Sequence, residues 1–185
     1  MRRSIRSARR ADIARLDIEI AGTREIPLGS DKFILRTRAD RIERRKDGTY
    51  SILDYKTGAP PSASQVQTGL SPQLTLEAAI LRGGGFKGIE ANSPVTQLAY
   101  VHLHGGPDGG NDKPVKFKDS TADTEADLAW ARLVKFVMRF DDPATGYLSR
   151  ETPMFMRRGG GDYDHLARVK EWSLSGGTDD DGDGE

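Results

Sequence analysis

The sequence predicts a mixed α/β domain in which strands come first and helices and strands follow. Three observations support this fold class. Apolar and polar residues alternate over 16–20, two extended runs flank an Asp47-Gly48 turn, and apolar residues recur at helical spacing near residue 130. Period-two alternation is typical of a half-buried strand, and a spacing of three and four residues is typical of an amphipathic helix.

The N-terminal quarter predicts a helix followed by strands. Residues 1–15 are rich in Arg and Ala, which favour helix, and no capping residue precedes them. We therefore expect the chain to begin inside a helix, as a domain cut from a longer protein would. The alternation over 16–20 predicts a first strand, and the residues Pro27, Gly29 and Ser30 predict the turn after it.

Two further extended runs follow, over 33–45 and 50–56. Asp-Gly is a favoured two-residue hairpin turn, so Asp47-Gly48 should join them. The three runs together are expected to form an antiparallel meander.

The second half predicts helices around one more strand. Ser71 is expected to cap a helix with Pro72 at its first position, and Gly83 begins the stop. Residues 95–103 have strand composition, and 105–114 form a loop rich in Gly, Pro, Asp and Asn. A helix that ends near Asp142-Pro143 is expected to pack on the core through Leu128, Trp130, Leu133, Val134, Val137 and Met138. A shorter helix is expected over 162–172.

Composition limits the class of protein. The 185 residues carry 28 basic and 28 acidic side chains and no cysteine, which excludes a disulfide scaffold, a thiolate zinc site and an iron–sulfur cluster. No apolar run reaches the length of about 20 residues that spans a bilayer. We therefore expect a cytoplasmic protein without a membrane partner. One domain is expected over 1–174, followed by a disordered acidic tail over 175–185.

The chemistry is concentrated around the predicted hairpin. Residues two apart on a strand share a face, so Asp54 and Lys56 should point the same way. A hairpin closed at Asp47-Gly48 should also bring Asp40 near Asp54. Two close carboxylates cannot both stay ionised cheaply without a cation, and Mg²⁺ or Mn²⁺ prefers such oxygen ligands. The alternative is an ordinary cross-strand salt bridge on a solvated face.

These residues also carry a resemblance. Asp40, then Asp54-Tyr55-Lys56, then Gln73 in a following helix resemble the PD-(D/E)XK nuclease superfamily, and specifically its RecB-like branch. The runs RADRIER, ILDYKTGAPPSASQVQTGLSPQLTLEAAIL and DYDHLARVKEW are similar to the C-terminal nuclease domains of the AddB family. The resemblance implies a restriction-endonuclease-like mixed sheet, with an antiparallel meander flanked by helices.

The resemblance also implies roles for these residues. Asp40 and Asp54 would bind Mg²⁺ or Mn²⁺, helped by the backbone carbonyl of Tyr55. Lys56 would position or deprotonate the attacking water, and Gln73 would orient Lys56 or contact the DNA backbone.

The sequence departs from the pattern of the relatives at several points. Glu77 stands where many relatives have a tyrosine, and it is equally compatible with an auxiliary site residue and a surface carboxylate. Relatives use a further ligand upstream of the first aspartate, for which Glu19 is a possible substitute. Many AddB proteins also hold an iron–sulfur cluster, which a chain without cysteine lacks; packing of Trp130, Phe136 and Trp172 would close the ends of the domain instead.

The function that follows is a Mg²⁺-dependent DNA exonuclease domain acting in double-strand break repair. Its partners would be DNA and an AddA-type helicase-nuclease subunit. The alternative is a catalytically silent DNA-binding or assembly module of the same fold, motivated by the missing upstream ligand. That module is also favoured by a basic N-terminal quarter, in which 14 Lys and Arg stand against 7 Asp and Glu over residues 1–46. A stand-alone structure-selective nuclease is a third, less favoured possibility.

Overall fold

A computed structural model describes residues 11–103 and 110–146 of the chain. Contacts divide the chain into two units after Asp141, and the helices and strands described below lie in the first. Several expectations lie outside the described residues and stay predictions: the helix over 1–10, the helix over 162–172, the role of Trp172, the domain end at 174 and the acidic tail over 175–185.

The core of the fold is a five-stranded sheet with the order β1-β2-β3-β4-β5. Neighbouring strands run antiparallel except β3 and β4, which are parallel. The strands are β1 Ile13–Leu28, β2 Asp31–Arg45, β3 Tyr50–Lys56, β4 Val95–His102 and β5 Asn111–Pro114. The expected meander is thus formed by β1, β2 and β3, and the mixed sheet of the predicted fold class is confirmed.

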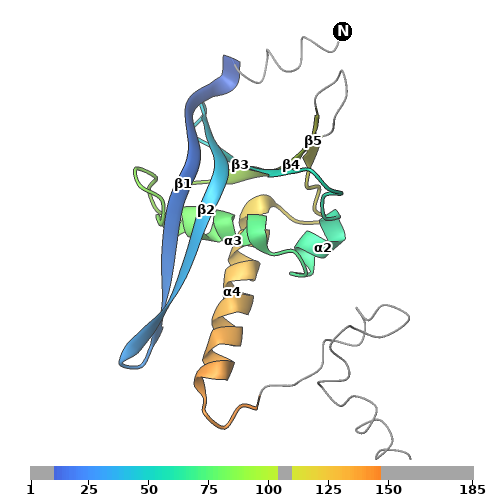
Figure 1. Cartoon of the computed structure of the whole chain (residues 1–185). Coiled ribbons are helices and arrows are strands. Elements are labelled where there is room, and N and C mark those ends of the chain that lie inside the picture. The colour runs from blue at the N-terminus through green and yellow to red at the C-terminus, as the bar shows by residue number, and fades with distance from the viewer. Residues whose placement is uncertain (1–10, 104–109, 147–185) are drawn as a thin grey trace, which may run out of the picture. The chain divides into compact units, whose positions relative to one another are not determined.

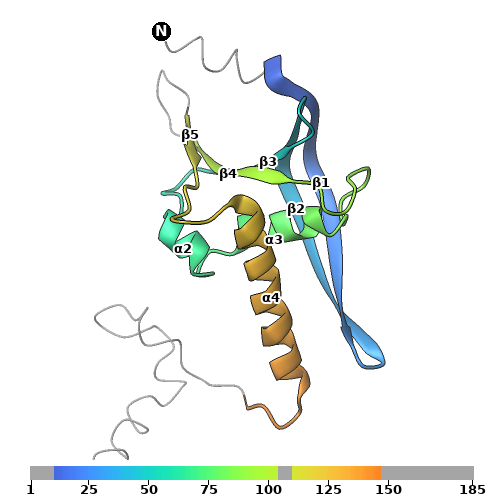
Figure 2. The same ribbon diagram turned by 180° about the vertical axis from the view of Figure 1, so that it is seen from behind.

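Three helices accompany the sheet in the described part of the chain: α2 Ala63–Gln67, α3 Gln73–Arg82 and α4 Ala122–Asp141. Parallel strands need a crossover connection, and α2 and α3 lie in the one that joins β3 to β4. Figures 1 and 2, from opposite sides, show α3 and α4 on one side of the long β1–β2 hairpin. The buried core between helices and sheet includes Ile42, Ile52, Leu74, Ala78, Leu98 and Tyr100.

The turn between β2 and β3 differs from the two-residue turn expected. Arg45 N donates to Thr49 O at 2.8 Å and Gly48 N donates to Arg45 O at 3.0 Å, so three residues separate the last bonded pair. Gly48 has φ +85°, a left-handed conformation that glycine adopts without steric cost. Hairpin turns must match the right-handed twist of the strands they join. After the two-residue turns, a three-residue loop that ends in a left-handed glycine is the next most common connection.

Two further local predictions were wrong. Residues 13–15 belong to β1 instead of the expected N-terminal helix, because they pair along β2. The four residues Asn111–Pro114, expected in a loop, form β5, because the edge of β4 offers them a partner strand.

The helix boundaries also differ in detail. Pro72, not Ser71, is the N-cap of α3, and no side chain caps this helix. The fixed φ of proline suits this position, where its φ is −82°. The short helix α2 was not predicted, although Ser62 and Gln65 form a capping box that its sequence encodes.

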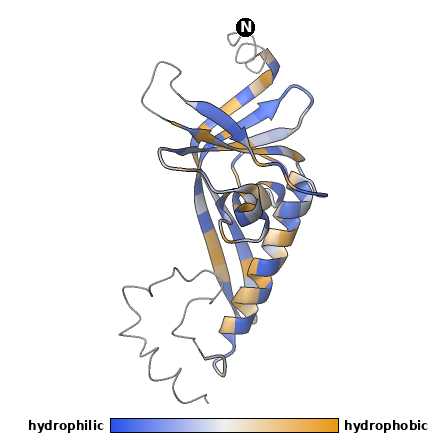
Figure 3. Cartoon of the chain, turned by 90° about the vertical axis from the view of Figure 1, so that its right-hand side faces the viewer, coloured by the Kyte–Doolittle hydropathy of each residue, from blue (hydrophilic) through white to orange (hydrophobic). Residues whose placement is uncertain are grey.

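The face that α4 buries was predicted only in part, since Trp130, Leu133, Val134 and Val137 are half-buried but the other predicted residues are exposed. Its buried residues are Ala122, Glu125, Ala126 and Ala129, with Trp130 partly buried against the core. Leu128, Phe136 and Met138 are instead 43%, 61% and 58% exposed, so Phe136 does not help to close the domain as expected. Figure 3 shows hydrophobic and hydrophilic bands side by side along α4. The small alanines let α4 approach α3 closely. This contact determines which face of α4 is buried, which the spacing of apolar residues alone did not predict.

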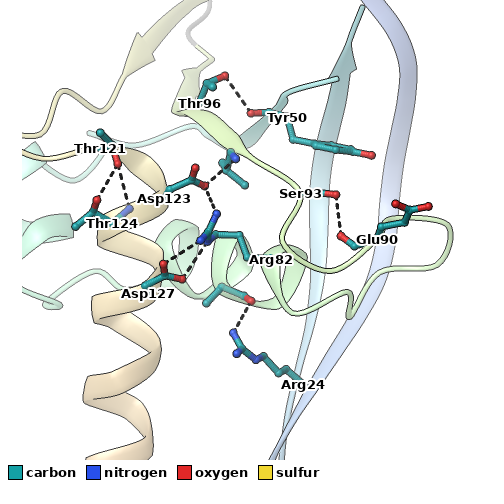
Figure 4. Close-up of polar contacts among 12 residues, drawn as sticks. Arg24, Tyr50, Arg82, Glu90, Ser93, Thr96, Thr121, Asp123, Thr124 and Asp127 are labelled. Carbon is teal, nitrogen blue, oxygen red and sulfur yellow. Dashed lines mark hydrogen bonds and ion pairs between the residues drawn. The ribbon is translucent and has the colours of Figure 1, made fainter. Parts of the chain in front are cut away.

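An ion-pair network fixes α3 against α4 and β4. The guanidinium of Arg82, at the end of α3, lies 2.7 Å from Asp123 Oδ1 and 2.9 Å from Asp127 Oδ2, both on α4 (Figure 4). Asp123 also accepts a hydrogen bond from Val95 N at the start of β4. On the other side, Arg24 of β1 donates to the carbonyl of Ala79 at 2.8 Å. These contacts hold α3 at one angle on the sheet and so determine where its N-terminal side chains lie.

Candidate active site

Two aspartates lie at the same level of the β2–β3 hairpin. The antiparallel ladder pairs Arg41 with Leu53, and the next residues along are Asp40 and Asp54. Asp40 Oδ2 accepts a hydrogen bond of 2.9 Å from the backbone N–H of Tyr55. Asp54 is buried, with 3% of its surface exposed, and its register partner on the other side is Tyr100 of β4. The hairpin therefore holds one half-buried and one buried carboxylate on adjacent strands.

Lys56 and Gln73 surround the carboxylate of Asp54. Lys56 Nζ lies 2.9 Å from Asp54 Oδ2, and it also donates to Gln73 Oε1 at 3.2 Å. Gln73 Nε2 in turn donates to Asp54 Oδ1 at 2.7 Å. Asp54 and Lys56 share a face of β3, as their spacing requires, while Gln73 comes from the first turn of α3. The ammonium of Lys56, the side-chain amide of Gln73 and the carboxylate of Asp54 thus form a closed ring of contacts.

Glu77 extends this ring by one residue. It lies four residues after Gln73, on the same face of α3, and only 2% of its surface is exposed. Its Oε1 accepts hydrogen bonds from Gln73 Nε2 at 3.3 Å and from Thr37 Oγ1 of β2 at 3.1 Å. Its Oε2 is buried and has no hydrogen-bond partner in the part of the chain that is described. The side chain is therefore a buried carboxylate in contact with Gln73 and not a surface carboxylate.

Burial and the two aspartates disfavour the charged form of Glu77. Desolvation is the largest cause and raises the pKa of this carboxyl from 4.5 to about 7. Its hydrogen bonds with Gln73 and Thr37 work in the opposite direction, and the charges of Asp54 and Asp40 add to the rise. Burial, followed by the charges of Asp54 and Glu77, likewise raises the pKa of Tyr100 to about 12. The centre of the site is thus a region of concentrated negative charge in a poorly solvated place.

The side chains of Tyr55 and Glu19 make their described contacts outside the ring of Asp54, Lys56 and Gln73. The ring of Tyr55 points to the other face of β3 and its hydroxyl accepts a hydrogen bond from Arg41 Nη1 at 3.1 Å, which leaves its backbone carbonyl as the group for a site role. Glu19 lies in β1 between Ile18 and Ile20, and it has an unusual φ of +51°. Its side chain is 61% exposed and its Oε2 lies 3.9 Å from Arg38 Nη1.

The donor set suits a hard divalent cation. Within residues 11–103 and 110–146, no group of three or more acidic, histidine or cysteine side chains is close enough to hold a metal ion. Mg²⁺ does not require such a group, because it keeps several waters and binds through one or two carboxylates. Among the described residues, Asp54 Oδ2 has no hydrogen-bond partner and forms an ion pair with Lys56, so it has a lone pair to offer. Asp40, Asp54 and the carbonyl of Tyr55 are therefore chemically compatible with Mg²⁺ or Mn²⁺.

Sequence reasoning missed two residues that contact or face this ring, Thr37 and Tyr100. Thr37 lies three residues before Asp40 on β2, and Tyr100 lies on β4, which is distant in sequence. Thr37 falls in an alternating run of the strand, which offered a weak signal. No signal for Tyr100 existed without the parallel pairing of β3 with β4.

Residues 1–148 match the PD-(D/E)XK nuclease superfamily. The uncharacterized protein RT0391 of Rickettsia typhi is 35% identical over 97 residues, which are 51% of this chain and 11% of that protein. An uncharacterized protein of Rickettsia bellii is 33% identical over 87 residues, 47% of this chain and 10% of the relative.

A shorter match reaches the uncharacterized protein RC0550 of Rickettsia conorii, 50% identical over 48 residues, 26% of this chain and 6% of that protein. The chain thus spans about a tenth or less of the length of these curated relatives. Among solved structures, the crystal structure of SSO0001 is similar with a TM-score of 0.38 and 17% identity, covering 72% of this chain and 56% of that one.

Proposed function

The chain belongs to the PD-(D/E)XK nuclease superfamily, and we propose that it is a Mg²⁺-dependent deoxyribonuclease domain. Divalent cations are the typical cofactor of this superfamily. The observation that carries the proposal is the ring of contacts at the hairpin end, in which Lys56 and Gln73 meet the buried carboxylate of Asp54.

Each residue of the ring has a role in phosphodiester hydrolysis. Asp40, Asp54 and the carbonyl of Tyr55 would hold the cation, which would supply a lower pKa for bound water and positive charge to offset the charge that develops on the phosphate. Lys56 is 35% exposed, so its ammonium group can reach a phosphate or a water at the mouth of the site. There it positions the attacking water and offsets negative charge in the transition state. Gln73 holds Lys56 through Oε1 and Asp54 through Nε2, and so fixes the distance between the two.

Within the superfamily we propose an AddB-type role: an exonuclease that acts with an AddA-type helicase-nuclease subunit in double-strand break repair. The support is the resemblance of the runs RADRIER and ILDYKTGAPP to that family. The residues of the ring address phosphate and cation and not base edges, so low sequence preference is expected. No helix in the described portion is long and apolar enough to cross a membrane.

The experiment is a digestion of single-stranded DNA by the full chain with Mg²⁺ or Mn²⁺, compared with Asp54→Ala. The matched control is Asp47→Ala, a change at the tip of the same hairpin, where the carboxylate caps the turn by accepting from Thr49. We expect cleavage by the wild type and by the control, and none by Asp54→Ala, with DNA binding retained. Cleavage that survives in Asp54→Ala would refute the proposal.

A second candidate function is a DNA-binding or assembly module without catalysis. It is favoured by the absence of a three-ligand cluster among the residues described. This module would bind DNA with an affinity that falls steeply with salt and does not change with Mg²⁺. Cation-dependent cleavage by the wild-type chain excludes it.

A further inference from the structure

Glu77 is a buried acid that the roles above leave unused. It is as buried as the core residues around it, at 2% exposure, yet it lies in contact with Gln73, which also binds Asp54. Burying an ionisable group without a compensating partner is costly, and such groups are retained mainly where they serve a site. Its second oxygen therefore calls for a partner that the described part of the chain does not supply.

The two oxygens of Glu77 are in different situations. Oε1 accepts from Thr37 on β2 and from Gln73 on α3, so two elements of the fold fix the orientation of the carboxylate. Oε2 is buried and has no hydrogen-bond partner in the described residues. A carboxylate held by one oxygen, with the other left free beside two further acids, is arranged to receive a cation or one of its waters.

We propose that Glu77 is a third acidic residue of the divalent-cation site, acting through its free Oε2. This inference rests on the proposed function, because it assigns a residue to the same cation. Bound Mg²⁺ keeps several waters, and a water in the cation's hydration shell is the kind of donor that Oε2 lacks. Glu77 thus binds the cation as a nearby charge and not as one of a tight ligand set. Thr37 and Gln73 are positioning residues in this arrangement.

The position of Glu77 on α3 supports the assignment. Residues one helical turn apart share a face of the helix. Because Gln73 reaches Asp54, Glu77 faces the same pair of strands. The Arg82 ion pairs hold the far end of α3 and limit how far this face can turn away. The docking of α3 on the sheet therefore determines where the carboxylate of Glu77 lies.

The test is a calorimetric titration of the full chain with Mn²⁺ and with Mg²⁺, on wild type, Glu77→Gln and Asp54→Ala. The matched control is Glu125→Gln. Glu125 of α4 is also 2% exposed and also accepts from a glutamine amide, that of Gln67, but it lies outside the ring. Glu77→Asp is included because it keeps the charge, and thermal unfolding of each variant checks that it folds.

We expect Glu77→Gln to weaken cation binding by at least about tenfold, the lower end of what loss of a supporting residue costs at metal sites. Glu125→Gln should bind as the wild type does, and Glu77→Asp should bind more tightly than Glu77→Gln. Wild-type affinity in a folded Glu77→Gln, with binding lost in Asp54→Ala, overturns the inference and leaves the proposed function intact. If the wild type binds neither cation, the proposed function fails as well.

Discussion

The burial of Glu77 has a cost in stability that replacement by glutamine should remove. In protein stripped of cations with EDTA, the folded state raises the pKa of Glu77 from 4.5 to about 7. Between these two values the folded state binds more protons than the unfolded state, so the free energy of unfolding should fall as pH rises through this window. At about 1.4 kcal/mol per unit, a rise from 4.5 to about 7 costs about 3 kcal/mol once Glu77 is fully ionised.

Glu77→Gln keeps the shape of the side chain and an oxygen that accepts from Thr37 and Gln73, but it carries no charge. In EDTA at pH 8 the variant should therefore be more stable than the wild type by about 3 kcal/mol, and this advantage should shrink toward zero near pH 4. Groups that do not interact with Glu77 contribute equally in both proteins, so the difference reports on Glu77 and its immediate neighbours.

The assay is urea unfolding followed by tryptophan fluorescence, at one-unit pH steps from 5 to 8, with EDTA throughout. Equal dependence of the two proteins on urea concentration serves as the control, because it shows that both expose the same surface on unfolding. A stability difference that does not change with pH, or a variant less stable than the wild type at pH 8, would refute the reasoning. A variant that gains stability and loses cation affinity would mean that the protein retains an acid that destabilises it because the site uses it.

The remaining predictions concern Lys56 and Arg82. Lys56→Met should bind Mn²⁺ at least as tightly as the wild type, because the ammonium competes for Asp54 Oδ2, while single-turnover DNA cleavage falls by about 100-fold or more; unchanged cleavage would exclude Lys56 from the chemistry. Arg82→Ala should lower the free energy of unfolding by about 2 kcal/mol, since its hydrogen bonds to the carboxylates of Asp123 and Asp127 are lost. Urea unfolding checks this value, and a loss well under 1 kcal/mol would mean that the network is only a surface feature.

The hairpin was predictable because its information is local. The three-residue loop puts Asp40 and Asp54 at the same level, one position beyond the Arg41–Leu53 pair, whereas a two-residue loop at Asp47-Gly48 would shift the register by one and put Asp40 opposite Tyr55. Period-two alternation likewise put Asp54 and Lys56 on one face of β3. The exact turn was not predictable, because Asp-Gly fits more than one hairpin loop.

Contacts between distant segments could not be predicted in the same way. Spacing suggested that Leu128 and Met138 of α4 face the core, yet both are exposed. Helical periodicity gives a helix and a set of candidate faces, but the neighbour decides which face is buried. Here α3 offers a close contact surface and the ion pairs of Arg82, and both favour the alanine face of α4.

By itself, the sequence determined the meander, the helix after Pro72, the proximity of Asp40 to Asp54 across the hairpin and the face of β3 that Asp54 shares with Lys56. These follow from interactions between residues close in the chain or counted from one turn. Only the tertiary structure decided that Gln73 reaches both Asp54 and Lys56, that Tyr100 lies beside Asp54, and that Glu77 is buried with an Oε2 that has no hydrogen-bond partner among the described residues. Those features depend on how a crossover docks α3 and β4 on the sheet, and the free energy of that docking is a sum over packing and ion pairs distributed along the whole chain.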